Sequence, residues 1–362
     1  MKSSLPKYGN FSLILIFIFS LFFIQCENEK VSKPTSNAVG YISEINITTD
    51  DETAKYLRDA LLNSLAAPQE YLSPAEPFYK LNFIGIDNFA VGYLEYQLQV
   101  IIITSENIDQ MKHLNKLFEK KIFDSLCNES SVSVVKRKNI WAINQTIFFV
   151  FAPNAETVRL YLRDKGSLLK NDIYQTEIKD FIARTGEKNH SLANIIREKH
   201  SIYMRIPKFF NLDINKQNYY SAIWEEGDAI CNLLINILPD SPVINHGKAE
   251  QMLAQRKIDG QKHLQMDTVG LYIGTSQNFF QDYTPYQING FKGGKINGWW
   301  VIEGMFRGGP YTRYTIYLPK IKKWVALEAL VYYPNLENKN QGKTKTRYLR
   351  TIESIIHSIK EI

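Results

Sequence analysis

The sequence predicts an α+β fold made of two α/β halves whose sheets are mostly antiparallel. Strand-like and helical patterns alternate in the first half, and successive strands with short turns fill the second half. The chain then closes on an amphipathic helix. Of its 362 residues, 44% are apolar and 22% are charged, which is ordinary globular usage and excludes a disordered, collagen-like or coiled-coil protein.

The N-terminus has the pattern of an export signal. Lys2 and Lys7 precede an apolar run over residues 11–24, which only two serines interrupt. A helix of that length rises about 21 Å, whereas the hydrocarbon core of a bilayer is roughly 30 Å thick. The run therefore predicts a signal peptide over residues 1–25 rather than a membrane span.

Cys26 follows the apolar run directly, and polar residues come immediately after it. This order resembles the lipobox of bacterial lipoproteins, in which the cysteine is diacylated and becomes the mature N-terminus. We expect lipid attachment at Cys26, a polar tether over residues 26–38, and a lipid-anchored location in the cell envelope, at the outer membrane. Gln25 stands where a lipobox usually has a small residue, so a plain secretory signal with an incidental cysteine is the alternative.

The rest of the chain is expected to form two domains, residues 39–199 and residues 200–362. An alternating strand over residues 39–48 and a helix that follows polar N-cap candidates open the first domain. The helical pattern before residue 199 gives way to β-branched and aromatic strand patterns. That change in pattern sets the predicted boundary.

The second domain is expected to contain an antiparallel meander. Its three aromatic-rich strand patterns are separated by a Gly-Gly-Pro turn at residues 308–310 and by Pro319–Lys320 (residues 295–306, 311–318 and 322–333). A closing helix over residues 345–360 carries one apolar stripe, which predicts that it packs on the sheet.

Four segments resemble one family of uncharacterised Bacteroidota lipoproteins, grouped as domain of unknown function 4837. The first is the lipobox-like start, Cys26 with residues 33–36, and the second is a Pro-rich passage, residues 68–70 with 76–78. The third is the Ile-Pro-Lys opening of the second half at residues 206–208. The fourth is an aromatic–glycine stretch, residues 298–300 with 305–311 and 328–334. The resemblance covers essentially the whole mature chain and implies a lipoprotein, but no chemistry. The second half also resembles the PsbP type of α/β sandwich.

Motifs for catalysis, metals and nucleic acid are missing from the sequence. The six histidines form no H-E-x-x-H or H-x-H pattern, and no G-x-S-x-G elbow occurs. A formal charge of +6 without a basic stripe gives no support for nucleic-acid binding. Cys127 and Cys231 are expected to be free thiols, with a disulfide as the alternative. We therefore expect no metal, no cofactor and no catalytic residues.

The strongest candidate for binding is the aromatic–glycine stretch. If half of its rings face outward, they form a flat platform for a sugar ring or for the apolar anchor of a partner, and its two arginines add donors for carboxylate or phosphate groups (Trp299, Trp300, Phe306, Arg307, Tyr311 and Arg313). The alternative, which the residue types favour, is that these strands pack into the core.

Two functions follow from this reading. The first is a non-enzymatic binding or assembly module of the envelope, anchored to the membrane and partnered by an envelope protein or a glycan. The second is a hydrolase acting on envelope or dietary glycan through carboxylates such as Glu226 or Glu303, since paired carboxylates are the groups that cleave glycosidic bonds.

Overall fold

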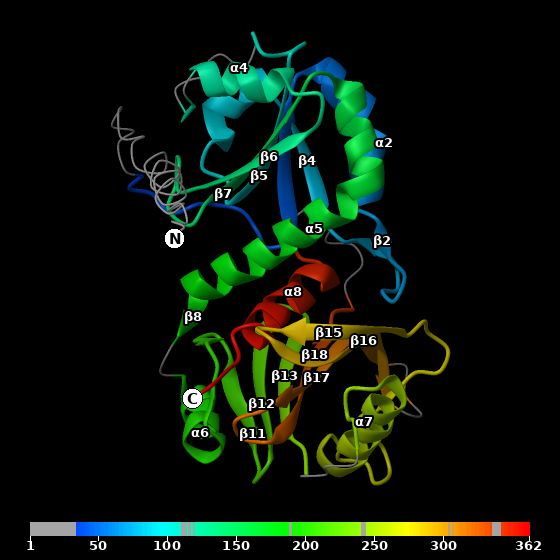
Figure 1. Cartoon of the computed structure of the whole chain (residues 1–362). Coiled ribbons are helices and arrows are strands. Elements are labelled where there is room, and N and C mark those ends of the chain that lie inside the picture. The colour runs from blue at the N-terminus through cyan, green and yellow to red at the C-terminus, as the bar shows by residue number, and fades with distance from the viewer. Residues whose placement is uncertain are drawn as a thin grey trace, which may run out of the picture.

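The computed structural model describes residues 34–109, 114, 117–118, 120–187, 190–239, 244–302, 305, 307–334 and 342–362. These residues form two layered bodies, one above the other in Figure 1, with the long helix α5 (Ala155–Thr185) running between them. The α+β class is confirmed. Cys26, Glu303 and Phe306 lie outside the described residues.

The first body is built on a five-stranded sheet. Its strand order is β4-β1-β5-β7-β6 (β4 Lys80–Gly85, β1 Glu44–Thr49, β5 Leu98–Thr104, β7 Thr146–Ala152, β6 Ser133–Lys138). Strand β1 pairs in parallel with β4 and β5, β5 pairs in parallel with β7, and only β6 is antiparallel. This sheet departs from the antiparallel prediction because helical crossovers return the chain to the same end of the sheet before each parallel strand.

Helices cover both faces of this sheet. Helix α2 (Asp51–Leu65) starts where the Asp50 carboxylate accepts a hydrogen bond from the Thr53 amide, and it buries leucines spaced four residues apart. It packs with α5 on one face. The short helices α3 (Ile86–Asn88) and η1 (Phe89–Tyr93), with α4 (Lys120–Asn128), lie on the other. Because both faces are covered, β5 and β7 are buried along their whole length.

The second body confirms the predicted antiparallel sheet. Its order is β11-β12-β13-β18-β17-β16-β14, and β15 also pairs with β16 (β11 Asn211–Asn215, β12 Tyr219–Glu226, β13 Ala229–Ile237, β18 Lys323–Tyr332, β17 Gly308–Leu318, β16 Phe291–Ile302, β14 Ile273–Thr275, β15 Asp282–Ile288). Helices α8 (Lys345–Ile356) and α6 (Ser191–His200) pack on one face, and α7 (Ala249–His263) packs on the other.

The Gly-Gly-Pro segment is not the turn that was predicted. Residues 308–310 are the first residues of β17, where Gly309 pairs with Trp300. A β-carbon on Gly309 would lie 2.0 Å from the carbonyl oxygen of Val331. Glycine is therefore required here by close approach between strands rather than by a turn.

The division between the two bodies lies before residue 190 rather than at residue 199. Leu192 and Ile196 of α6 belong to the core of the second body, as does Ile182 near the end of α5. Two-residue strands complete the junction and the chain end (β8 Gly186–Glu187 with β10 Ile206–Pro207; β9 Ile202–Tyr203 with β19 Lys360–Glu361; β2 Pro68–Gln69 with β3 Glu76–Pro77).

Two further expectations concern thiols and membrane spans. Cys127 and Cys231 are both free and buried, as the sequence predicted. Among the described residues, no helix has the length and apolar character needed to cross a membrane.

Candidate functional site

Three residues of the predicted aromatic platform are buried. Trp300, Tyr311 and Arg313 are 6%, 0% and 3% exposed, on the sheet face that α7 covers. The indole Nε1 of Trp300 donates to the Val331 carbonyl at 3.1 Å. These side chains therefore do not form the candidate outward-facing platform, and they show the core packing that the residue types favoured, because α7 covers this face of the sheet.

Trp299 is partly exposed, and Arg307 is exposed. Trp299 stacks on Phe279, with ring centroids 4.9 Å apart, and the guanidinium of Arg307 lies 5.9 Å from the ring of Tyr332. Phe306 lies outside the described residues. The stretch is thus divided between core and surface, and the structure does not bring its six residues together on one face.

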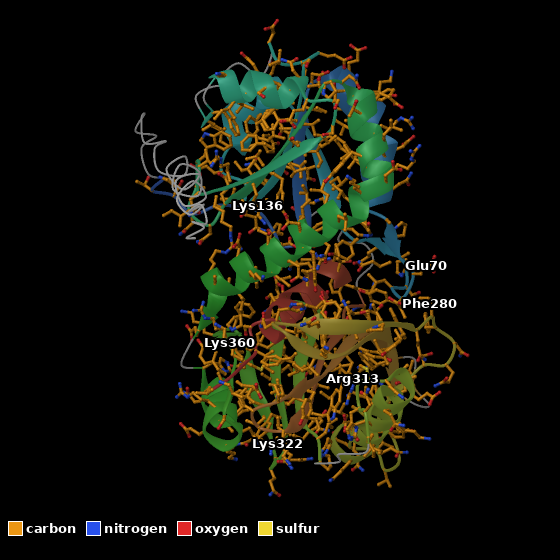
Figure 2. The ribbon with its side chains drawn as sticks, in the orientation of Figure 1. Glu70, Lys136, Phe280, Arg313, Lys322 and Lys360 are labelled. Carbon is orange, nitrogen blue, oxygen red and sulfur yellow. The ribbon has the colours of Figure 1, made fainter. Side chains whose placement is uncertain are left out.

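Arg313 belongs to a buried network of four charges instead. It donates to Asp259 at 2.7 Å and to Glu328 at 2.8 Å, and Glu328 also accepts from Arg256 at 3.0 Å. Figure 2 shows Arg313 in the interior of the second body. Burial opposes the charge of Arg313, but Asp259 and Glu328 outweigh burial and raise its pKa. The network joins α7 to β17 and β18.

A second buried network joins the two bodies. Arg350 on α8 donates to Glu177 on α5 at 2.8 Å, and Glu353, one turn further on, accepts from Lys295 at 2.8 Å. Burial would raise the pKa of Glu353, but Lys295 and Arg350 lower it to about 2. Tyr314 also donates to Glu353 at 2.7 Å. Both carboxylates are thus engaged by basic and hydroxyl groups in the interior.

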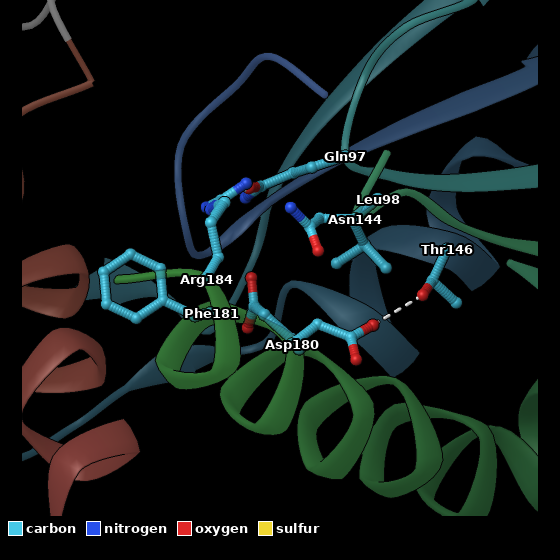
Figure 3. Close-up of a pocket in the computed structure, with 8 residues that line it drawn as sticks. Gln97, Leu98, Asn144, Thr146, Asp180, Phe181 and Arg184 are labelled. Atoms are coloured by element: carbon cyan, nitrogen blue, oxygen red, sulfur yellow. Dashed lines mark hydrogen bonds between the residues drawn. The ribbon is translucent and has the colours of Figure 1, made fainter. Parts of the chain in front are cut away.

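A small cavity lies where α5 passes beneath the first sheet (Figure 3). Its volume is 20 Å³, about the space of one water molecule. Asp180 accepts from Thr146 at 2.6 Å, and Arg184 donates to Gln97 at 2.7 Å. This cavity is too small for a ligand, and four of its polar side chains already bond one another in these two pairs.

A much larger cleft opens between the two bodies. Its volume is 470 Å³, within the range of small-molecule sites. The first body contributes three tyrosines and residues of β1 and β4, and the second contributes the end of β12 and the segment that leads into α8 (Tyr41, Glu44, Lys80, Asn82, Ile84, Tyr93 and Tyr96; Glu226, Gly342, Lys343 and Arg347). The cleft is therefore the candidate functional site.

The alternation of side chains along β4 places three of the lining residues on one face of the sheet. Lys80, Asn82 and Ile84 are alternate residues of an edge strand, so their side chains share one sheet face. Glu44 is the register partner of Lys80, and its carboxylate lies 3.1 Å from the Lys80 ammonium. The amide of Asn82 donates to Asn46 at 3.1 Å. The parallel pairing of β1 and β4 thus fixes one wall of the cleft.

The opposite wall comes from the second body. Arg347, in the first turn of α8, lies 3.2 Å from Glu226, and its guanidinium lies 4.7 Å from the ring of Tyr41. Gly342 has φ of +63°, and a β-carbon there would lie 2.5 Å from the Tyr41 ring. Glycine therefore lets the backbone of the second body contact a tyrosine of the first.

Of the carboxylates considered from the sequence, Glu226 lines the cleft and Glu303 lies outside the described residues. Glu226 is paired with Arg347, and no group of three or more potential metal ligands occurs in the part of the chain that the structure describes. The other cleft residues were not recognised in the sequence. They come from distant segments without a motif, and no sequence pattern connects them.

Comparison with protein families divides the chain as its packing does. Residues 189–358 match a family model described as domain of unknown function DUF4837, and residues 38–186 match a model described as domain of unknown function DUF8532. The expected family is thereby confirmed for the second half. The first half matches a separate family model, so one family does not span the whole mature chain as the resemblance implied.

Two solved structures show a distant likeness to this chain. The Ran-binding protein Mog1p of Saccharomyces cerevisiae is 9% identical with a TM-score of 0.28, covering 44% of this chain and 90% of that one. The human StarD13 (DLC2) lipid transfer and protein localization domain is 12% identical with a TM-score of 0.22, covering 46% of this chain and 97% of that one. No curated protein matches the sequence. These likenesses assign no function.

Proposed function

We propose that this chain, whose residues 189–358 match the DUF4837 family model, is a non-enzymatic binding or assembly module of the cell envelope. Lipid on Cys26 would hold it to the outer membrane. The cleft between the two bodies would receive its ligand, an envelope protein or a glycan. The observation that supports this proposal is the cleft lining, which combines tyrosine rings with charged side chains from both halves of the chain.

The lining suits recognition because its groups are already positioned. Glu44 is paired with Lys80, and Glu226 is paired with Arg347, so ordering these side chains costs little when a ligand arrives. Tyr41 is 45% exposed and presents ring surface to the cleft. Tyrosine supplies a large contact area with few rotatable bonds, which favours binding.

The same cleft supports the second candidate, a glycan-directed hydrolase. Glu44 and Glu226 both line it, and a pair of carboxylates is the usual machinery for cleaving a glycosidic bond. Each of them is occupied by a basic side chain, which fits binding better than proton transfer. Glu226→Gln separates the two functions, because it should abolish the phenotype of an enzyme, whereas a binder keeps Arg347 and the tyrosine rings and should lose only part of its affinity. Glu303→Gln tests the other carboxylate considered from the sequence.

The test of the proposed function is crosslinking in intact cells, followed by affinity purification of the tagged chain and mass spectrometry. Four strains are compared: wild type, Cys26→Ala, Tyr41→Ser and Tyr56→Ser. Tyr56 is the matched control, since it is 50% exposed on α2 and does not line the cleft. We expect one envelope partner or glycan to be recovered from wild type and Tyr56→Ser and lost from the other two. A partner retained by both Tyr41→Ser and Cys26→Ala would contradict the proposal.

A further inference from the structure

We infer that the interdomain cleft binds an acidic saccharide, whose ring packs on the cleft tyrosines and whose carboxylate pairs with Lys343. This inference rests on the proposed function, because it names the ligand class for that same cleft. It commits to a carboxylated sugar rather than a lipid or a peptide. Three properties of the lining lead to it: the charge balance, the aromatic surface and the polar groups that remain available.

The cleft lining has one more basic side chain than acidic side chains. Among the described lining residues, Lys80, Lys343 and Arg347 are basic, and Glu44 and Glu226 are acidic. Lys80 lies 3.1 Å from Glu44, and Arg347 lies 3.2 Å from Glu226. Lys343 has no ion-pair partner within the described parts of the chain. A ligand with one negative charge would complete this set.

The aromatic surface favours a ring with an apolar face. Tyr93 and Tyr96 lie with ring centroids 5.6 Å apart and planes inclined by 31°, and Tyr41 faces the same cleft. The C–H face of a pyranose packs well on a tyrosine ring, since that face is apolar and roughly flat. An apolar ligand such as an acyl chain would need aliphatic surroundings, but among the described lining residues Ile84 is the only aliphatic side chain.

Hydrogen-bonding groups remain available for sugar hydroxyls. The Asn82 amide nitrogen donates to Asn46, which leaves the Asn82 oxygen as an acceptor aimed by β4. The hydroxyls of Tyr41, Tyr93 and Tyr96 make no hydrogen bond to any residue within the described ranges. Hydroxyl-rich ligands both donate and accept, so they can satisfy this mixed set of groups.

The two walls of the cleft are held at a fixed separation. Glu76, in β3 of the first body, accepts hydrogen bonds from the backbone amides of Lys345 at 3.1 Å and Thr346 at 2.8 Å, in the first turn of α8. This contact fixes the start of α8 just after Lys343. Because the walls are preorganised, binding does not require closure of the two bodies.

The experiment is titration calorimetry on the purified full chain in mild detergent. The probes are trigalacturonic acid, sialyllactose and N-acetylmuramic acid, and the matched neutral probe for each acid is its full methyl ester. We expect at least one acidic probe to bind, its affinity to fall about tenfold to a hundredfold in Lys343→Gln, and the ester to bind the wild type correspondingly weakly. Lys322→Gln is the control, a charge removal in the turn between β17 and β18 at the far end of the second body (Figure 2).

Failure of the inference can be told apart from failure of the proposed function. Equal affinity for the acidic probe that binds and for its methyl ester, or no effect of Lys343→Gln on a correctly folded variant, would overturn recognition of the acidic group. If no saccharide binds, yet Tyr41→Ser still loses its crosslinked partner in cells, the ligand class is overturned and the binding function stands. If no saccharide binds and the crosslinked partner survives Tyr41→Ser, both are overturned.

Discussion

Arg350 on α8 and Glu177 on α5 form a buried ion pair between the two bodies, with Nη1 2.8 Å from Oε2. Both side chains are at most 3% exposed. Glu177 also accepts hydrogen bonds from the Ser43 amide at 2.6 Å and the Tyr79 hydroxyl at 3.0 Å. Glu177 therefore links α5 and two further segments of the first body to Arg350 of the second. This pair fixes how the cleft-forming halves meet.

Arg350→Met should destabilise the chain by about 3–5 kcal/mol, because it leaves the Glu177 carboxylate buried without its cation. The pKa of Glu177 is raised, because burial raises it by more than the nearby Arg350 lowers it. Urea unfolding at neutral pH measures the loss. The double variant Glu177→Gln with Arg350→Met should lose less than the single variant, since no charge remains uncompensated. A single variant as stable as wild type would show that the pair contributes nothing at the interface.

Glu328→Gln tests the network beneath α7. The change removes the carboxylate that Arg256 and Arg313 share, so two buried guanidinium groups are left with only Asp259. We expect a loss of about 3–5 kcal/mol in the free energy of unfolding. Glu225→Gln, on the exposed side of β12, is the control and should change stability by less than about 0.5 kcal/mol.

His357 predicts a specific dependence of stability on pH. The ring lies 5.6 Å from that of Tyr314 and 5.7 Å from that of Tyr286, and burial lowers its pKa to about 4, although Glu353 acts to raise it. The folded state therefore binds this proton less readily than the unfolded state, whose value is about 6.5. The stabilisation is complete above pH 6.5 and is lost as pH falls from 6.5 to 4, by at most about 3 kcal/mol.

His357→Phe should flatten this part of the profile, because phenylalanine keeps the ring contacts and does not titrate. Thermal unfolding of both proteins between pH 7 and pH 4 makes the comparison. Acid sensitivity below pH 4.5 should persist in both, since the pKa of Glu353 is lowered to about 2 and its stabilising charge is lost over that lower range. Parallel curves for the two proteins between pH 6.5 and pH 4 would contradict the assignment to His357.

Local patterns predicted much of the fold. The apolar stripe of the closing helix correctly predicted α8, and alternation with short turns predicted the antiparallel strands β16, β17 and β18. Both depend on residues close together in the sequence. The parallel sheet was missed because the order of β1, β4 and β5 depends on contacts between distant segments, which hydrophobic alternation does not encode.

The site was less predictable for the same reason. The residue types favoured core packing of the aromatic–glycine stretch, but the sequence does not show which helix covers it. Asp259 on α7 pairs with Arg313, and the guanidinium of Arg256 on α7 lies 4.0 Å from the Tyr311 ring. The cleft joins Tyr41 to Lys343, which are separated by nearly the whole chain. Neither residue stands in a motif, so only the packing of the two bodies brings them together.

Gly342→Ala should weaken ligand binding in the cleft by displacing the Tyr41 ring. An alanine β-carbon would meet the Tyr41 ring at 2.5 Å, and φ of +63° is unfavourable for any residue with a side chain. The backbone strain costs about 1–2 kcal/mol, and the Tyr41 ring, whose centroid lies 4.7 Å from the Arg347 guanidinium, must shift to make room. We therefore expect a modest fall in melting temperature together with weaker ligand binding.

Tyr41→Phe helps to separate the fall in melting temperature from the weaker ligand binding. It keeps the ring that packs on Gly342 and removes only a hydroxyl that has no partner in the described chain, so stability should hardly change. Gly270→Ala is the matched backbone control: its φ is +85°, an added β-carbon would have no atom within 4 Å, and it does not line the cleft. This variant should show the backbone strain without displacing the Tyr41 ring. If Gly342→Ala reduced ligand affinity no more than Gly270→Ala did, the position of the Tyr41 ring would not determine binding.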